Sequence, residues 1–295
     1  MEWQQILGFY HTARLRSFTK AAQATFRSQS ALSQQIKALE EELDCQLIER
    51  IGTRRLVLTT FGEHFLQFAD KVLLERDNLL SELNELRDLH RGPLRIAAPF
   101  TTLYHLMPRP LKRFRERFPE VRFSILDRPQ DAVIELVRNG DVDFGIALES
   151  IASKGLNVVR WKKLHSVLLM PKNHPLTNQK SFTLRDIRNA PLILPPKDQP
   201  HSYREVLEEH FRRQGIDFHV VMESSNVELS SMYVEMGLGL SFATIVKGYN
   251  PLGSRNLAMI SLDRYIKPGH LAVFMRKGEQ AVTYKKSFLK ELFRT

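Results

Sequence analysis

Residues 17–43 carry the pattern that most constrains the fold of this chain, SFTKAAQATFRSQSALSQQIKALEEEL. Small residues at Ala21 and Ala22 allow a first short helix to lie close against its neighbour, and Ser28 stands where a second helix needs an N-cap. The second helix has an apolar stripe at the i, i+4, i+7, i+11 spacing of one helical face. The stripe consists of Leu32, Ile36, Leu39 and Leu43. We interpret the segment as two helices joined by a tight turn.

The opposite face of the second helix carries only uncharged or positive hydrogen-bonding side chains at its start. These are Gln29, Ser30, Ser33, Gln34 and Lys37, preceded by Ser28. The first carboxylate comes at Glu40. Amides and hydroxyls can bond base edges or phosphates, whereas the DNA backbone would repel a carboxylate. The pattern predicts a helix-turn-helix with residues 29–43 as the recognition helix.

The stretch ERIGTRRLVLTTFG follows, with Gly52 and Thr53 as a turn between two short extended pieces. This pattern predicts a two-stranded wing whose arginines Arg50, Arg54 and Arg55 reach a minor groove or phosphates. The alternative is an exposed basic turn without a DNA contact.

The pattern of residues 60–89 predicts one long helix, because residues 63–89 contain neither Gly nor Pro and apolar residues recur at every seventh position. The heptad residues are Phe65, Val72, Leu79 and Leu86. Such a stripe needs a partner, and we expect the same helix of a second subunit; packing against the body of its own chain is the alternative. His90, Arg91, Gly92 and Pro93 then break the helix.

At 295 residues the chain is long enough for two or three domains. Its single cysteine, Cys45, excludes an internal disulfide and a cysteine-rich zinc site and fits a reducing compartment. The net charge is +10, yet residues 1–92 hold 12 Lys and Arg against 13 Asp and Glu, which leaves 31 against 20 in residues 93–295. The basic excess therefore lies outside the DNA-reading segment. It either serves solubility alone or attracts a small anion or DNA.

The remainder of the chain alternates between extended and helical patterns, which predicts a mostly parallel sheet covered by helices. We expect a single helix whose face runs from Leu103 to Phe118, and a helix that Asp131 caps and Gly140 ends. Linkers near Lys162 and at 267–269 indicate that the chain crosses twice between two lobes.

These residues resemble the LysR-type transcriptional regulator family. SFTKAAQATFRSQSALSQQIKALEEELDCQLIER and LTTFG are similar to the start of that family, and RNGDVDFGIA and VEMGLGLSFA to phrases of its effector-binding domain. Three positions depart from the family pattern, which usually has proline at Ser30, arginine at Gln34 and glycine at Asp44. The wing is also one residue longer around Gly52. These departures bear on which DNA sequence is read.

The resemblance implies an N-terminal all-α winged helix-turn-helix at 1–60, a linker (dimerisation) helix at 61–89, a hinge at 90–93 and an effector-binding domain at 94–295. That domain is implied to be α/β and two-lobed, similar to periplasmic binding proteins, with lobe I at about 94–162 and 268–295 and lobe II at about 163–267. The family further implies a homotetramer built as a dimer of dimers on double-stranded DNA, a small-molecule effector, and RNA polymerase as a partner.

An effector between the lobes would lie at strand C-terminal ends and helix N-termini, where free N–H groups and the helix dipole favour an anion. The candidate contacts are Thr101, Thr102, Arg128, Ser202, Tyr203, Ser225 and Asn226. For the Thr, Ser, Tyr and Asn side chains, capping without ligand contact is the alternative; for Arg128, it is an ordinary surface arginine.

Enzymatic chemistry finds little support in the sequence, which lacks a GxxxxGK[ST] loop, an HExxH pair and a G-x-S-x-G elbow. We expect no catalytic residue, no metal site and no cofactor, and Cys45 as a packed structural thiol. No secretory signal is visible, so a cytoplasmic protein is expected. The rival hypothesis is a solute-binding protein or enzyme whose N-terminal helices serve only oligomerisation.

Overall fold

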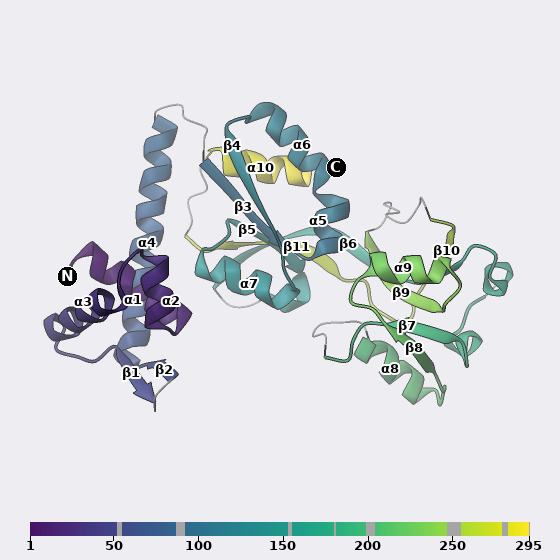
Figure 1. Ribbon diagram of the computed structural model, residues 1–295. Coiled ribbons are helices and arrows are strands. Elements are labelled where there is room, and N and C mark those ends of the chain that lie inside the picture. The colour runs from purple at the N-terminus through teal and green to yellow at the C-terminus, as the bar shows by residue number, and fades with distance from the viewer. Residues whose placement is uncertain are drawn as a thin grey trace. The chain divides into compact units, whose positions relative to one another are not determined.

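The computed structural model describes residues 1–51, 55–86, 92–152, 155–179, 181–198, 204–246, 255–278 and 283–294. The chain divides into two units, residues 1–89 and residues 90–295, shown in Figure 1. Within the described ranges, no helix is both long and apolar enough to span a bilayer.

The first unit contains three helices, a hairpin and a long helix. In chain order these are α1 (Trp3–Leu15), α2 (Phe18–Ala24), α3 (Gln29–Glu42), β1 (Ile48–Ile51), β2 (Arg55–Leu58) and α4 (Thr60–Leu86). Ser28 caps α3, and its side chain accepts a hydrogen bond from the Ala31 N–H at 3.2 Å. The predicted helix-turn-helix is therefore present, with its recognition helix at the expected position.

The core of this unit forms where α1, α2 and α3 meet. Its buried residues are Phe9, Ala13, Ala21, Ala22, Leu32, Ile36, Leu39 and Leu47. The predicted stripe is confirmed at its first three positions, but Leu43 is 37% exposed. Leu43 is the C-cap of α3, and the chain turns away from the core through Asp44, whose φ of +50° is left-handed. Asp44 therefore adopts the backbone conformation for which glycine is better suited.

The long helix α4 contacts the helix-turn-helix through its N-terminal half. Phe65 meets Phe9 edge to face with ring centroids 5.0 Å apart, and Ala69 is fully buried. Arg14 of α1 binds both carboxylate oxygens of Asp70 at 2.7 and 2.8 Å. Further along the helix, apolar side chains are exposed. They are Leu79, Leu80 and Leu83.

The second unit is built on a mixed sheet in the order β4-β3-β5-β11-β6-β9-β7-β8, with β10 added beside β6. The strands are β3 (Gly92–Ala98), β4 (Val121–Asp127), β5 (Phe144–Leu148), β6 (Leu156–Pro171), β7 (Pro191–Leu194), β8 (His219–Glu223), β9 (Leu240–Val246), β10 (Leu257–Ser261) and β11 (His270–Arg276). The helices are α5 (Phe100–Leu106), α6 (Pro108–Arg117), α7 (Gln130–Asn139), α8 (Arg204–Arg213), α9 (Val227–Glu235) and α10 (Thr283–Phe293), with short 3₁₀ turns at Glu149–Ile151, Pro175–Asn178 and Leu184–Ile187.

The prediction of a mostly parallel sheet is wrong for the centre of the sheet. Strand β3 is parallel to β4 and β5, and β7 is parallel to β8 and β9. In contrast, β11 is antiparallel to both β5 and β6, and β6 is antiparallel to β9 and β10. The C-terminal strand β11 inserts between β5 and β6, and local patterning gives no sign of so distant a pairing.

The linker expected near Lys162 is instead part of a 16-residue strand, β6. Its first half, through Lys163, pairs with β11, and its second half, from Leu164, pairs with β9. One continuous strand therefore belongs to the sheets of both lobes. A register shift between Leu271 and Ala272 leaves Trp161 as an extra residue in β6, a bulge that bends the strand.

Two helix predictions in the first lobe are also wrong in detail. The single helix expected from Leu103 to Phe118 is divided into α5 and α6 at Met107, because Pro108 has no N–H to continue α5 and occupies the first position of α6. Asp131 is not the N-cap of α7: the cap is Pro129, and Asp131 lies in the first helical turn, where its charge suits the helix dipole.

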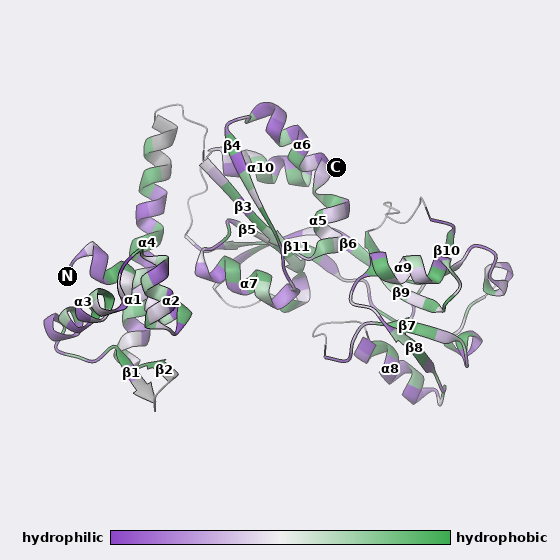
Figure 2. Cartoon of the chain, in the orientation of Figure 1, coloured by the Kyte–Doolittle hydropathy of each residue, from purple (hydrophilic) through white to green (hydrophobic). Residues whose placement is uncertain are grey.

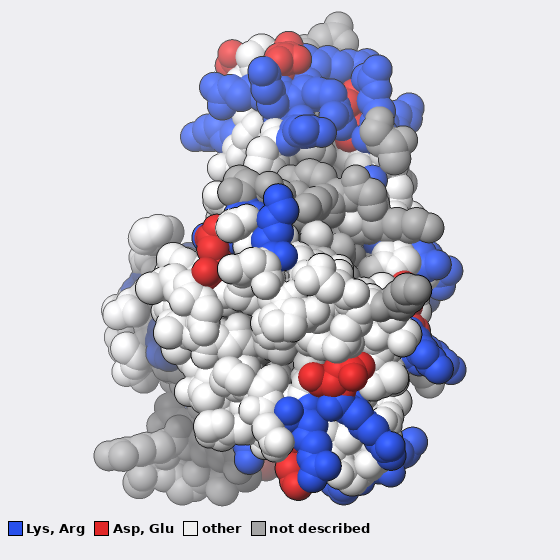
Figure 3. Space-filling model, turned by 90° about the vertical axis from the view of Figure 1, so that its right-hand side faces the viewer, with Lys and Arg blue, Asp and Glu red and all other residues white. Residues whose placement is uncertain are grey.

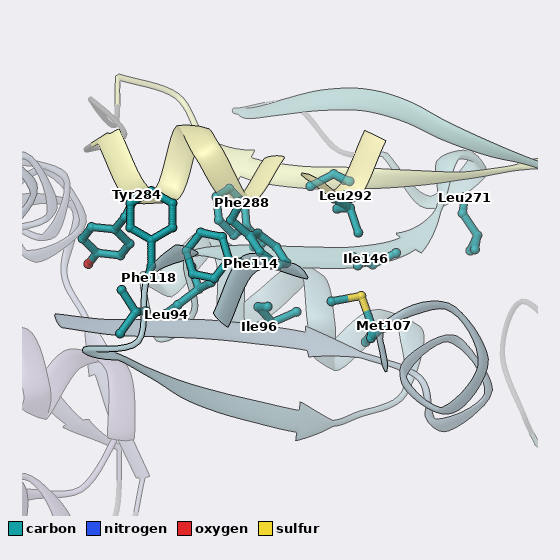
Figure 4. Packing of buried hydrophobic residues seen from close by; sticks show 14 of the residues in the cluster. Leu94, Ile96, Met107, Phe114, Phe118, Ile146, Leu271, Tyr284, Phe288 and Leu292 are labelled. Carbon is teal, nitrogen blue, oxygen red and sulfur yellow. The ribbon is translucent and has the colours of Figure 1, made fainter. Parts of the chain in front are cut away.

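Each lobe has its own apolar core. In lobe I, α6 and α10 pack on the sheet, and Figure 4 shows Phe114 and Phe288 facing each other, with centroids 5.4 Å apart. Lobe II buries Leu207 and Phe211 of α8 against β7 and β9. In Figure 2 the helices show apolar stripes on one side and polar residues on the other, as on α7.

Candidate nucleic-acid interface and effector site

The polar face predicted on the recognition helix is accessible in the structure. Side chains of Ser28, Gln29, Ser30, Gln34 and Lys37 are exposed and that of Ser33 is half-buried. The Ser28 and Ser30 hydroxyls share a hydrogen bond of 3.1 Å. Lys37 pairs with Glu41 at 3.6 Å, but both side chains are mostly exposed, so this pair holds the lysine only weakly.

The turn between α2 and α3 contains a residue that the sequence interpretation missed. Phe26 follows the C-cap Thr25 and has a left-handed backbone with φ +56°. The Phe26 N–H donates to the Gln23 carbonyl and the Arg27 N–H to the Ala22 carbonyl, at 3.2 and 2.9 Å, which is a Schellman motif. Glycine is usual at this position, and an L-residue is strained there by about 1–2 kcal/mol. The signal in the sequence is the absence of glycine from the turn.

The predicted wing is confirmed as the antiparallel hairpin of β1 and β2, in which Ile48 pairs with Leu58. Its turn, including Arg54, lies outside the described residues, and only the backbones of Arg50 and Arg55 are described.

Glu40, near the C-terminal end of α3, joins the recognition helix to the wing. Its Oε1 accepts hydrogen bonds from the N–H groups of Leu47 at 2.7 Å and Ile48 at 3.1 Å. A carboxylate at a helix C-terminus is opposed by the dipole, so these two bonds have to outweigh that cost. Between α3 and β1 lies a groove of about 530 Å³, lined in part by Ser33 and Lys37. Glu40 therefore positions the wing beside the polar face.

Thr101 and Thr102, the effector candidates of lobe I, lie in the first turn of α5, directly after β3. The alternative that they cap this helix is excluded, because the N-cap is Pro99 and the Thr102 N–H donates to the Pro99 carbonyl at 2.9 Å. Thr102 is 7% exposed. Neither threonine hydroxyl has a hydrogen-bond partner among the described residues.

Arg128 lies at the same sheet edge, after β4. Its backbone N–H donates to the Ala98 carbonyl at 3.1 Å, which holds the loop beside the end of β3. Its exposed guanidinium donates to the Asp127 carbonyl at 2.7 Å.

In lobe II, Ser225 and Asn226 follow β8. For Asn226 the capping role is observed: its Oδ1 accepts from the Leu229 N–H at 3.0 Å, at the start of α9. Ser202 and Tyr203 lie outside the described residues, and α8 is described from Arg204 onward.

Arg204 is a buried arginine that the sequence interpretation did not single out. Its Nη1 donates to the Pro195 carbonyl and to Glu223, both at 2.6 Å, and its Nε donates to Glu208 at 2.7 Å. Burial lowers the pKa of Arg204, but the hydrogen bonds to Glu208 and Glu223 outweigh burial and raise it. The guanidinium thus ties the start of α8 to the ends of β7 and β8.

A hydrogen bond joins the two lobes next to these candidates. His105 of α5 is hydrogen-bonded to Glu228 in the first turn of α9. Arg255 approaches Glu228 at 3.8 Å and Glu235 at 3.5 Å. No local sequence pattern pairs His105 with Glu228, because the two are 123 residues apart.

The basic excess of residues 93–295 is concentrated in part on α6. Figure 3 views the molecule from the right-hand side of Figure 1 and shows Lys and Arg gathered at the top, where Figure 1 places α6. The exposed basic residues of this helix are Arg109, Lys112, Arg115 and Arg117.

Comparisons with known proteins agree on one family. Residues 3–63 match the bacterial regulatory helix-turn-helix proteins of the lysR family, and residues 87–294 match the LysR substrate-binding domain. The regulator Cbl of Escherichia coli K12 is 32% identical over 242 residues, covering 81% of this chain and 76% of Cbl. The regulator SsuR of Burkholderia cenocepacia is 27% identical over 281 residues, covering 94% and 90%.

A solved structure extends the likeness to the whole fold. A variant of full-length OxyR from Pseudomonas aeruginosa superposes with a TM-score of 0.66 at 22% identity, covering 99% of this chain and 93% of that one. The curated relatives are named as transcriptional regulators, which favours that function over the solute-binding protein or enzyme considered from the sequence.

Proposed function

The chain belongs to the LysR family of bacterial transcriptional regulators, and from this membership we propose how it reads DNA and senses its effector. It is a DNA-binding regulator with a domain for a small-molecule effector. In the proposal, α3 enters the major groove. Bases and phosphates are then contacted by Ser28, Gln29, Ser30, Ser33, Gln34 and Lys37, and the flanking groove is held by Arg50, Arg54 and Arg55.

The observation that carries this proposal is the exposed amide and hydroxyl face of α3. It holds two glutamines, which can form paired hydrogen bonds to adenine, and a lysine for phosphate or guanine. The carboxylate of Glu40 does not interfere, because its Oε1 is engaged by the Leu47 and Ile48 N–H groups.

Two variants of the full chain separate base reading from phosphate contact. Duplexes are selected from a random pool by the wild-type protein, and binding is measured at two salt concentrations. Gln29→Ala is expected to cost about 1–3 kcal/mol and relax the preference at one base position, whereas Arg54→Ala weakens all sequences alike and lowers the salt slope by about one. Gln179→Ala, an exposed glutamine of lobe II, is the matched control. Unchanged sequence preference and affinity for Gln29→Ala would contradict the assignment of α3.

The proposed effector is a small anion held between the lobes. The contacts would come from Thr101, Thr102, Arg128, Ser202, Tyr203, Ser225 and Asn226. Two observations support this choice: the threonine hydroxyls lack partners among the described residues, and residues 93–295 carry a net positive charge. Footprints of the upstream DNA of its own gene, taken with and without a small-molecule extract of the host, test whether an effector shifts the protected region. Thr102→Val should abolish that shift and leave DNA binding without extract intact.

We further propose a homotetramer, a dimer of dimers, that acts in the cytoplasm, where bacterial DNA lies, and works through RNA polymerase. Support for self-association comes from the exposed leucines of α4 at 79, 80 and 83, which a second α4 would cover. Sedimentation of the purified chain tests the tetramer.

A further inference from the structure

Phe26 combines two features that are each unfavourable for the folded chain. Its side chain is 98% exposed, so folding gains nothing from burying the ring. Its backbone is left-handed, a conformation in which glycine or asparagine avoids strain. Among the described non-glycine residues with a left-handed backbone, which are Arg16, Phe26, Asp44 and Asn189, only Phe26 is apolar. A contact outside the folded chain accounts for an apolar ring that is exposed at such a position.

The position of Phe26 points to the nature of that contact. It lies three residues before Gln29, and consecutive Cα atoms are 3.8 Å apart, so the two Cα atoms lie within about 11 Å of each other. This upper limit is smaller than the width of the major groove, about 12 Å, so Phe26 and Gln29 can reach the same groove. The turn is held by the two backbone hydrogen bonds of its Schellman motif, so the ring projects from a defined backbone.

The surroundings of the ring argue against a protein-docking surface. The exposed residues within four positions of Phe26 are Gln23, Ala24, Ser28, Gln29 and Ser30, of which only the small Ala24 is apolar, and the adjacent Arg27 is half-buried. A protein-docking surface would instead be a contiguous apolar patch. An isolated apolar group beside a face that hydrogen-bonds bases suits the one apolar group that the major groove displays, the C5-methyl of thymine.

We propose that Phe26 packs against a thymine C5-methyl group and so reads a base next to the one contacted by Gln29. This inference rests on the proposed function of α3 as the recognition helix.

Phe26→Gly in the full-length chain tests the inference, because it removes the ring and the backbone strain together. Binding is measured to the duplex that the wild-type protein selects from a random pool. We expect affinity to fall about tenfold, equivalent to about 1.4 kcal/mol, while the thermal midpoint rises. The salt slope is unchanged, because no phosphate contact is lost. Phe100→Ala, an exposed phenylalanine of lobe I, is the control and binds as the wild type does.

Deoxyuridine replacing each thymine in turn identifies the methyl group. We expect deoxyuridine at one thymine of each half-site to lower the affinity of the wild-type protein. The same replacement should not lower the affinity of Phe26→Gly any further. Equal affinity of Phe26→Gly and the wild type would overturn the contact, and lost affinity that depends on no methyl group would overturn its assignment to thymine. If the wild-type protein selects no duplex at all, the proposed function of α3 fails and this inference falls with it.

Discussion

Removing the Glu40 carboxylate should loosen the wing from the recognition helix. Its Oε1 accepts from the Leu47 N–H at 2.7 Å and the Ile48 N–H at 3.1 Å, and the side chain is only half-buried. Each hydrogen bond to a charged group contributes about 1.5–3 kcal/mol, so the lower end gives about 3 kcal/mol for the pair. Relief of the repulsion from the α3 dipole returns about 0.5 kcal/mol. Glu40→Ala should therefore cost about 2.5 kcal/mol at the start of β1.

Hydrogen exchange of the Leu47 and Ile48 amides measures this cost directly. About 2.5 kcal/mol corresponds to roughly 60-fold faster exchange where opening is in equilibrium. Glu40→Gln keeps an acceptor oxygen without the charge, so it should fall between the wild type and Glu40→Ala. DNA affinity should fall with the loss of protection, because the wing is no longer held beside α3.

Glu41→Ala is the matched control for the effect of Glu40. Its carboxylate pairs only with Lys37 among the described residues, at 3.6 Å, with both side chains mostly exposed, so its loss should cost no more than about 0.5 kcal/mol. Unchanged exchange in Glu40→Ala, or an equal change in Glu41→Ala, would refute the idea that Glu40 holds the wing.

Three further predictions concern other parts of the chain. Gly62→Ala should lower the thermal midpoint, although Gly→Ala in a helix ordinarily stabilises, because a Cβ there would collide with the carbonyl of Leu47; an unchanged midpoint would contradict this packing. Leu79→Glu on α4 should shift sedimentation towards smaller species, since it puts a charge on the exposed stripe, and an unchanged profile would place the subunit interface elsewhere. Burial lowers the pKa of His174 from its ordinary 6.5, so the stability it contributes is complete above pH 6.5 and is lost as pH falls through the folded-state pKa. The Leu176 N–H donates to His174 Nδ1, so the protection of this amide, taken relative to its intrinsic exchange rate at each pH, should fall on acidification in the wild type and show no such step in His174→Ala.

The helix-turn-helix could be predicted from sequence because its determinants are local. Leu32, Ile36 and Leu39 repeat at helical spacing and are all buried, and Ser28 caps α3 as expected. Leu43 fits the same periodicity but is exposed, because periodicity does not register where a helix ends. Phe26 escaped notice because no apolar pattern includes it.

Long-range arrangements in the second unit were harder to predict. The insertion of β11 between β5 and β6 pairs residues more than 100 positions apart, so no local pattern in these strands predicts the antiparallel direction. Among the candidate effector residues, the sequence placed Thr101 near a helix start, but Pro99 turned out to be the cap. His105 and Glu228 meet only because two lobes bring α5 and α9 together.

The placement of β11 and α10 also sets the order in which the chain can fold as it is synthesised. Residues 1–89 hold every element of their own unit and can fold soon after they leave the ribosome. Lobe I begins at β3, but its sheet lacks a central strand until β11 has been synthesised. Its apolar core is incomplete until Phe288 and Leu292 of α10 have followed. The DNA-reading part of a nascent chain is thus complete while the sensing part is still open, and loss of the last dozen residues would leave a DNA-binding unit attached to an unfinished sensor.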